Sequence, residues 1–455
     1  MTELNGNELR ELQTFVVELG AAMSAVGESV DSVQDRLTRV AIAYGATEAR
    51  IRAFPTFMMV TMGRGEPATL ENASALAAAP RLDQIAALYR LVRDAEQGAV
   101  SPTEGVARLR DIRGMGPRFG PVQSIVGYSV LSVGLCLTLK PAPRDVAAAA
   151  VLGAVVGLLD AIGRHRPTLE ILMPVLAAFS VSALGALAVK EDLTGPGLRA
   201  TVASLVVFLP GAALTTAVLE LAAGQTVSGA SRLVSGIIQL AFLAFGIVAG
   251  IQAVGVPLSV AFEGSDDLLG EWAPWLGVLV FAAGVMVSNS APARSFPGLV
   301  IVLYSAAIGQ LVGNTIFGGQ MSAFVGALVM TPVAFWVSLL PSAMPPRASF
   351  LPGFWLLVPG ALGLIGLTQV AGDTGAAGAQ DLVNTVVSIF AIAVGVLSGT
   401  LLLRWGATTG RVVREMPALV DRRSRLQRLQ TRSGHHATPV QDDRDGDLPP
   451  GDQRQ

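Results

Sequence analysis

Part of this chain occurs twice. Residues 210–250 align with residues 359–399 at a constant offset of 149 positions and without a gap. Both copies lie in apolar sequence, and each contains a Pro-Gly pair inside a segment long enough to span a bilayer. Duplicated membrane units with interrupted helices are typical of secondary transporters, so the repeat favours that class. The identical residues at matched positions include Pro210-Gly211 with Pro359-Gly360, Gly229 with Gly378, Leu233-Val234 with Leu382-Val383, Gly246 with Gly395 and Gly250 with Gly399.

The composition agrees with a chain that lies mostly in a membrane. Of 455 residues 51% are hydrophobic and 15% are charged, whereas soluble domains carry roughly 25% charged residues. The single cysteine, Cys136, excludes an internal disulfide and a cysteine-based zinc site. Basic residues alternate with acidic ones near the N-terminus, which gives no indication of nucleic-acid binding. No Gly-rich segment ends in Gly-Lys-Ser or Gly-Lys-Thr, so we expect no ATP hydrolysis. We also expect no bound cofactor or metal.

Apolar runs of membrane-spanning length predict an α-helical polytopic protein with about ten spans. The offset carries the fourth span onto the ninth and the fifth onto the tenth, so each unit has five spans. An odd number of spans reverses the second unit in the membrane, which predicts an inverted repeat. The expected organisation is a head at 1–118, a first repeat at 119–254, a second repeat at 272–405 and a disordered basic and polar tail at 406–455. The expected spans are 119–139, 145–163, 168–189, 200–222, 233–254, 272–290, 295–313, 318–340, 350–371 and 381–403.

Basic residues close to the spans predict that both termini are cytosolic. Arginines cluster before the first span and after the last, and Arg232, Arg294 and Arg347 then also lie inside. The loops around 255–271, 314–317 and 372–380 carry no Lys or Arg. Four early basic residues oppose this orientation: Lys140, Arg144, Lys190 and Arg199.

The Pro-Gly pairs lie near the middle of their spans, roughly 15 Å deep at 1.5 Å per residue. Proline removes a helix hydrogen bond, and glycine accommodates the bend. Inverted copies would bring both breaks to the same depth, where we expect a substrate site formed by Pro210, Gly211, Pro359 and Gly360. A simple kink is the alternative for each pair taken alone.

Polar residues inside the spans are the other candidates. Thr215, Thr216 and Asn384 are expected to bind substrate, and Glu220 and then Asp160 to carry a proton. Glu220 has an alternative role at the cytosolic interface in a pair with Arg232. Asp160 has one in a helix-end ion pair with an arginine four residues later. The side chains of Gln239, Asn289, Gln310, Asn314 and Asn384 are equally consistent with hydrogen bonds between helices.

The sequence of the head predicts a small α/β domain. Apolar residues recur at helical spacing from Leu12 to Val40, and two β-like stretches follow at 49–54 and 57–62. Two helices close it, one at 81–97 and one capped by Ser101. The head has no His, Cys or Lys, which argues against a hydrolytic site. A polar cluster of Ser24, Glu28, Ser29 and Asp31 is explained as the cap of a helix that begins at Val30.

Taken together, these residues resemble the threonine/serine exporter (ThrE) family over roughly 10–405. The resemblance rests in the head on Glu18-Leu19-Gly20, Gly27, Gly45, Pro55-Thr56 and the stretch from Leu82 to Ile112. In the membrane part it rests on Pro210-Gly211, Glu220-Leu221, Gly224 and Ser228-Gly229-Ala230-Ser231-Arg232. The chain departs from the family at Ala25-Val26-Gly27, where relatives often have a Ser-Gly-Ala type sequence.

The resemblance implies a multi-pass carrier of the cytoplasmic membrane that exports threonine and serine and is driven by protons. Its expected partners are an amino-acid substrate, protons and the lipid bilayer, and the sequence leaves a homo-oligomer open. We expect no enzymatic activity. Two alternatives from other classes stay open: a membrane-anchored hydrolase that uses the head, and a channel or assembly partner.

Overall fold

The structure is a computed structural model of the whole chain. It describes residues 6–62, 69–72, 80–163, 172–194, 199–258, 269–340, 344, 346–357 and 383–403. The chain separates into a unit at Met1–Thr400 and another at Leu401–Gln455. The predicted tail at 406–455 lies outside the described residues.

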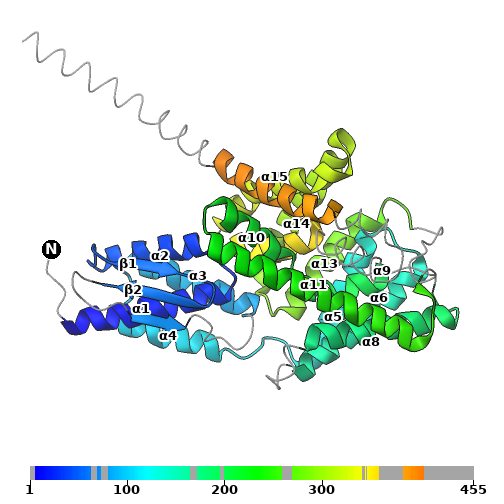
Figure 1. Cartoon of the computed structure of the whole chain (residues 1–455), viewed down its shortest axis with the longest axis horizontal. Coiled ribbons are helices and arrows are strands. Elements are labelled where there is room, and N and C mark those ends of the chain that lie inside the picture. The colour runs from blue at the N-terminus through cyan, green and yellow to red at the C-terminus, as the bar shows by residue number, and fades with distance from the viewer. Residues whose placement is uncertain are drawn as a thin grey trace, which may run out of the picture. The chain divides into compact units, whose positions relative to one another are not determined.

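The N-terminal segment, residues 6–114, contains four helices and three strands (Figure 1). The helices are α1 (Gly6–Ala25), α2 (Val30–Ala43), α3 (Leu82–Glu96) and α4 (Pro102–Gly114). The strands are β1 (Arg50–Ala53), β2 (Phe57–Thr61) and β3 (Thr69–Asn72). Six of these seven elements lie at predicted positions. The exception is β3, whose polar sequence Thr-Leu-Glu-Asn carries no strand pattern.

The three strands form an antiparallel sheet in the order β1-β2-β3. Ile51 pairs with Val60, and Val60 pairs with Thr69 on the other side. Ile51 and Ala53 are buried while Arg50 and Arg52 are exposed, as expected for a strand with one face on a core. That core unites the sheet with all four helices, and its largest fully buried side chains include Leu12, Phe15, Leu19, Met23, Leu37 and Met58.

The helical body, residues 121–403, is built of apolar helices. Within the described ranges, seven helices are long and apolar enough to cross a membrane, and three shorter apolar helices accompany them. The protein is therefore a mostly helical chain consistent with a polytopic membrane protein. The helices are α5 (Pro121–Thr138), α6 (Pro143–Gly163), α8 (Met173–Lys190), α9 (Arg199–Ser204), α10 (Gly211–Ala222), α11 (Thr226–Val254), α13 (Ala273–Ser288), α14 (Phe296–Phe317), α15 (Gly319–Ser338), α16 (Pro346–Leu357) and the helix at Val383–Leu403, with short 3-10 turns η1 (Val206–Phe208) and η2 (Ala293–Ser295).

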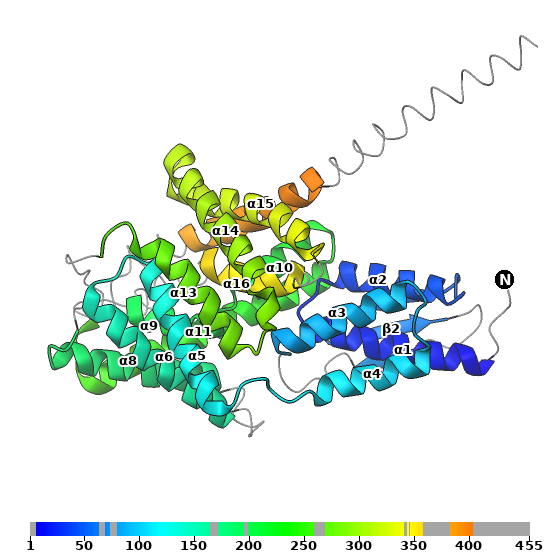
Figure 2. The same cartoon turned by 180° about the vertical axis from the view of Figure 1, so that it is seen from behind.

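Helices α5 and α13 pack side by side (Figure 2). A Cβ atom at Gly127 of α5 would lie 2.6 Å from the Ser288 nitrogen, and one at Gly277 of α13 would lie 2.9 Å from the Thr138 nitrogen. The start of each helix therefore contacts the end of the other, so the two helices are antiparallel.

Glycines at the centre of α5 and α13 also make reciprocal contacts across the pair. A Cβ atom at Gly134 would collide with Phe281, and one at Gly284 would collide with Leu131. Because residue 281 follows residue 131 by the same 150 positions that separate the two glycines, the contacts are reciprocal. Only glycine permits this approach, since any side chain would displace the facing backbone.

The contact of α11 with α8 is repeated, 149 positions later in the chain, by the helix at Val383–Leu403 and α15. A Cβ atom at Gly246 of α11 would lie 2.7 Å from the Val175 oxygen of α8, and one at Gly395 would lie 2.5 Å from the Phe324 oxygen of α15. Residue 324 follows residue 175 by 149 positions, as residue 395 follows residue 246. The sequence repeat is thus matched by a repeated helix packing.

Candidate functional site

The fourth predicted span is interrupted at Pro210. Helix α9 ends at Ser204 and the turn η1 at Phe208. Leu209 is extended with φ −71° and ψ 126°, and α10 begins at Gly211. Proline has no N–H to continue the helix, and it disfavours the helical conformation for the residue before it. The alternative of a simple kink is therefore wrong at Pro210, because the helix ends and restarts.

The Gln239 side chain satisfies a carbonyl group that this break frees, and Thr215 forms a hydrogen bond inside the helix that follows. The amide of Gln239 on α11 donates to the Phe208 oxygen over 2.7 Å. The Thr215 hydroxyl donates to the Gly211 oxygen over 2.9 Å, within its own helix. Thr215 and Thr216 are both buried, with 0% and 4% of their surfaces exposed. The two threonines are thus placed one turn beyond the break, inside the protein.

The second predicted break, at Pro359 and Gly360, lies outside the described residues. Helix α16 is described as far as Leu357, two residues before that proline. The Leu357 oxygen accepts a hydrogen bond of 3.4 Å from the Gln310 amide. Leu357 is the residue that the offset of 149 matches to Phe208, so equivalent carbonyls in the two copies both bind a glutamine side chain. Helix α16 also contacts α10, which brings the residues before Pro359 next to the helix that follows the break at Pro210.

Glu220 lies near the end of α10 with 1% of its surface exposed. One carboxylate oxygen, Oε2, lies 3.1 Å from Nε of Arg232 on α11. The other, Oε1, accepts a hydrogen bond of 3.1 Å from the backbone N–H of Val30, the first residue of α2. A carboxylate at a helix N-terminus satisfies an otherwise unpaired N–H and complements the helix dipole. The pair with Arg232 was the alternative role that the sequence left open.

This carboxylate belongs to a larger polar junction, which we define as Glu28, Val30, Asp31, Glu220, Gln225 and Arg232. Arg232 donates to the Glu28 backbone oxygen over 3.0 Å. Gln225, just before α11, donates to Asp31 Oδ1 over 2.5 Å. The junction joins the α1–α2 turn of the N-terminal segment to the α10–α11 hairpin of the helical body.

The junction corrects one expectation from the sequence. Ser29 occupies the N-cap position of α2, but its side chain makes no capping hydrogen bond. Glu220, 190 positions away, supplies an acceptor there instead. The Glu28 side chain accepts from Ser32 over 2.6 Å. Part of the polar cluster at this turn therefore serves a tertiary contact, which no local pattern could reveal.

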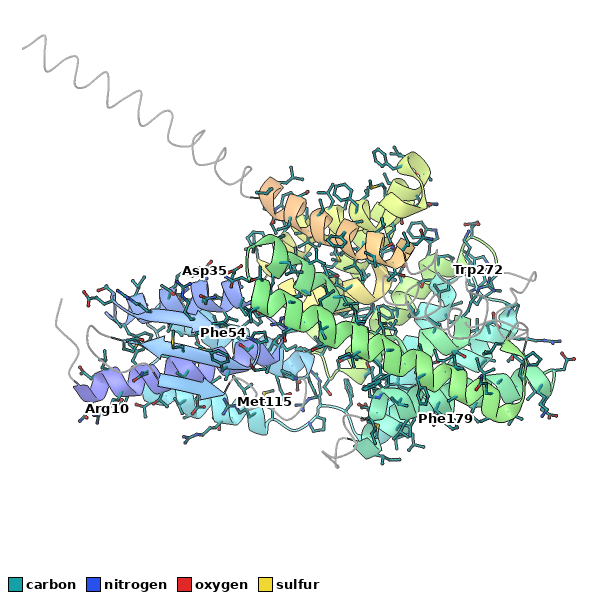
Figure 3. All side chains as sticks on the ribbon, viewed as in Figure 1. Arg10, Asp35, Phe54, Met115, Phe179 and Trp272 are labelled. Carbon is teal, nitrogen blue, oxygen red and sulfur yellow. The ribbon has the colours of Figure 1, made fainter. Side chains whose placement is uncertain are left out.

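A second contact joins α3 to the helical body. The Leu82 nitrogen donates to the Asn289 oxygen, just after α13, over 3.2 Å. Leu82, Ile85 and Tyr89 are buried in the core of the helical body, and α3 also contacts α16. The neighbouring Arg81 donates to the oxygen of Met115 over 2.8 Å, which holds the chain between α4 and α5. Met115 is labelled in Figure 3.

The remaining candidates lie elsewhere. Asp160 is half-buried near the end of α6, which packs against α5, α8 and α9. Its expected arginine partner at position 164 is outside the described residues. Asn384 is half-buried in the helix at Val383–Leu403, and Asn314 is exposed on α14. Across the described ranges, no group of three or more His, Cys, Asp or Glu residues is arranged to hold a metal ion.

Two of the four basic residues that opposed the predicted orientation, Lys140 and Lys190, have partners in the structure. Lys140 lies 2.7 Å from the Glu271 carboxylate, and Lys190 donates to the Val254 oxygen over 3.2 Å. Glu271 belongs to the loop before α13, and Val254 ends α11. Both lysines therefore contact the region around 255–271, which the sequence assigns to the side opposite the head.

Comparisons with known proteins give one family and one curated relative. The chain is 22% identical over 369 residues to "Pheromone-regulated membrane protein 10" of Debaryomyces hansenii, which covers 77% of this chain and 36% of that protein. The match thus spans about a third of the relative's length. No solved structure matches the chain. The family model described as "Putative threonine/serine exporter" (ThrE) matches residues 14–254, from the N-terminal segment to the end of α11. Because this match covers more than half of the sequence, the protein belongs to the ThrE family.

Proposed function

We propose that this protein is a secondary active exporter of threonine and serine that works by alternating access. The observation that carries the proposal is the helix break at Pro210, inside an apolar segment and beside α16. At membrane depth, non-helical backbone is tolerated only where it is buried in protein or lines a water-filled cavity. Discontinuous helices of this kind form the substrate sites of many secondary transporters.

The packing of α5 against α13 supports an inverted repeat. Equivalent helices that run antiparallel and exchange equivalent contacts are related by a local two-fold axis. Such an axis lies perpendicular to the helices, so it reverses one copy relative to the other in the membrane. We therefore propose two inverted five-helix repeats at 119–254 and 272–405, preceded by a small α/β head at 1–118.

The proposed substrate site lies between the two breaks. From the first repeat it includes Pro210, Gly211, Thr215 and Thr216, and from the second it includes Pro359, Gly360 and Asn384. The first N–H groups of α10 would receive the substrate carboxylate, because a helix N-terminus attracts anions. Thr215 donates its proton within the helix, so its oxygen lone pairs are available to an ammonium or hydroxyl group.

We propose that Glu220 carries the coupled proton, with Asp160 as the second candidate. Proton binding at Glu220 would remove the charge that pairs with Arg232 and weaken the acceptor for the Val30 N–H. Protonation would therefore loosen the polar junction at the end of α10. Since α10 begins at the break, the proton and the substrate would act on the two ends of one half-helix.

We further propose that the protein lies in the cytoplasmic membrane with both termini in the cytosol. In support, the N-terminal segment contacts Arg232 near the start of α11 and the connection after α13 that leads to Arg294. Lys140 and Lys190 contact groups on the side assigned to the exterior. This arrangement satisfies those two lysines without reversing the orientation.

Efflux of labelled threonine from cells preloaded with a threonine dipeptide tests the proposal. Cells that express the chain should lose threonine faster than control cells, with saturation, and a protonophore should abolish the difference. Flux that fails to saturate would instead indicate a channel. Equal efflux of both threonine and serine with and without the chain would contradict the substrate assignment.

A further inference from the structure

The N-terminal segment contacts both proposed repeats at once. The polar junction attaches it to the α10–α11 hairpin of the first repeat. Helix α3 attaches it to the second repeat through Asn289 and α16. Residues from three separate parts of the sequence thus meet on one side of the helical body.

These two attachments belong to one body. Helices α1 to α4 share a continuous core. Between α2 and α3, the Arg36 guanidinium lies 3.3 Å from the Glu96 carboxylate and 5.4 Å from the centre of the Tyr89 ring. A displacement of α2 would therefore carry α3 with it, so the segment cannot follow one repeat without pulling on the other.

The two attachments differ in chemistry. At α3 the contact is apolar, since Leu82, Ile85 and Tyr89 are buried in the core of the helical body, and separating them would expose that surface to water. The polar junction consists of charged and hydrogen-bonded groups, which water can replace at modest net cost. If one attachment opens during a cycle, it is the polar junction.

The polar junction also lies at the C-terminal end of α10, the helix that begins directly after the break at Pro210. Helix α10 runs 12 residues from Gly211 to Ala222, about 18 Å at 1.5 Å per residue. Movement at Glu220 is therefore transmitted along a single rigid element to Gly211.

We propose that the N-terminal segment is a brace that holds the two repeats together on its own side and releases the α10–α11 hairpin when that side opens. The inference rests on the proposed function in that it assumes two repeats that move relative to each other. It assigns Asp31, Gln225 and Arg232 as positioning residues, because they act on the break through α10.

The test measures how easily the interior opens on the side of the segment. The only native cysteine, Cys136, is buried, so Cys136→Ala with Thr216→Cys gives one reporter thiol beside the break. A charged methanethiosulfonate reagent is added to inverted membrane vesicles, and the rate of labelling is recorded. In this background, Asp31→Ala with Gln225→Ala removes one hydrogen bond of the junction. Labelling should become about fivefold faster, the factor given by about 1 kcal/mol of one hydrogen bond.

A matched control breaks a contact inside the segment alone. Glu18 and Arg113 form an ion pair of 3.1 Å between α1 and α4, so Glu18→Ala with Arg113→Ala should leave the labelling rate unchanged. Equal labelling in the junction variant and its parent, or the same increase in both double variants, would overturn the brace.

Threonine and serine efflux by the same double variants, without the reporter, separates this inference from the proposed function. If neither solute is exported by any form while labelling rises in the junction variant alone, the brace stands and the assigned substrates are wrong. If the solutes are exported while labelling is unchanged, the exporter stands and the brace is wrong.

Discussion

The Glu220 carboxylate accepts a hydrogen bond of 3.1 Å from the backbone N–H of Val30, across 190 positions of the chain. A residue expected to act inside the membrane thus also fixes the first turn of a helix in the N-terminal segment. The ion pair with Arg232 completes the contact. Glu220, the proposed proton carrier, therefore also connects the helical body to the N-terminal segment.

Replacing Glu220 by Gln should destabilise the protein and remove the pH dependence of export. The change leaves Arg232 without its partner in a largely buried site, which typically costs about 3–5 kcal/mol. Adding Arg232→Gln should recover part of the lost stability, because the guanidinium charge that lost its ion-pair partner is then removed as well. Thermal unfolding of the purified variants and threonine efflux at several pH values check both effects. Normal export with an unchanged pH profile in Glu220→Gln would show that Glu220 is not the proton carrier.

Gln239→Leu should loosen the first break. The Phe208 oxygen would lose the 2.7 Å hydrogen bond from Gln239, and an unsatisfied buried acceptor costs about 1–3 kcal/mol. At the matching carbonyl of the second copy, that of Leu357, Gln310→Leu removes a longer bond of 3.4 Å, so its effect should be smaller. Unfolding temperatures and the KM and kcat for threonine efflux distinguish the two. A larger loss for Gln310→Leu than for Gln239→Leu would contradict the role assigned to Gln239.

Alanine at Gly246 and alanine at Gly395 should destabilise the protein to a similar degree. Each added methyl group would lie within 2.7 Å of a facing backbone oxygen, on Val175 and Phe324 respectively, and overpacking typically costs about 1–3 kcal/mol. Gly116→Ala is the control, since nothing lies within 4 Å of the position that its Cβ atom would take. Unfolding temperatures of the three variants in detergent give the comparison. A tolerant Gly246 beside an intolerant Gly395 would contradict equivalent packing.

The N-terminal segment should lose stability at alkaline pH through Tyr44. Burial raises the pKa of Tyr44 above its ordinary value of 10.0, and its hydroxyl donates to the Val100 oxygen. The native state therefore holds this proton more tightly than the unfolded state, so the stabilisation is present below about pH 10 and is lost as pH rises through the native pKa. Tyr44→Phe cannot titrate, and its stability should fall less between about pH 8 and about pH 11. Parallel losses in the two proteins would contradict this assignment.

Much of the helical body could be predicted from hydropathy, and the break at Pro210 from the occurrence of a Pro-Gly pair at matched positions of the repeat. Apolar runs mark α5, α6, α8 and α11 because a helix in lipid must be apolar along its length. The break follows from a local rule, the missing N–H of proline. Gly246 and Gly395 are matched positions of the sequence repeat, and in the structure they make matching contacts with Val175 and Phe324.

The polar junction could not be predicted in the same way. Val30 takes part only through its backbone N–H, which every residue except proline has, so the sequence does not mark it. Gln225 lies in a short loop, where glutamine is common and indicates no particular contact. The cluster around Glu28 and Ser29 could be explained locally as a helix cap, so nothing pointed to a distant partner. Long-range contacts between single polar groups produce no periodic pattern in the sequence. Strand β3 could not be predicted for a different reason, because apolar and polar residues do not alternate in it.

Transport by the purified protein tests the central claim most directly. The chain is reconstituted in liposomes, an inward or outward pH gradient is imposed, and the flux of labelled threonine is followed with the Pro210→Ala variant in parallel. We predict saturable threonine flux that follows the proton gradient and reverses with it, and a much lower rate for Pro210→Ala, in which α9 and α10 can join. Threonine and serine flux no faster than in protein-free liposomes, under either gradient, would contradict the account.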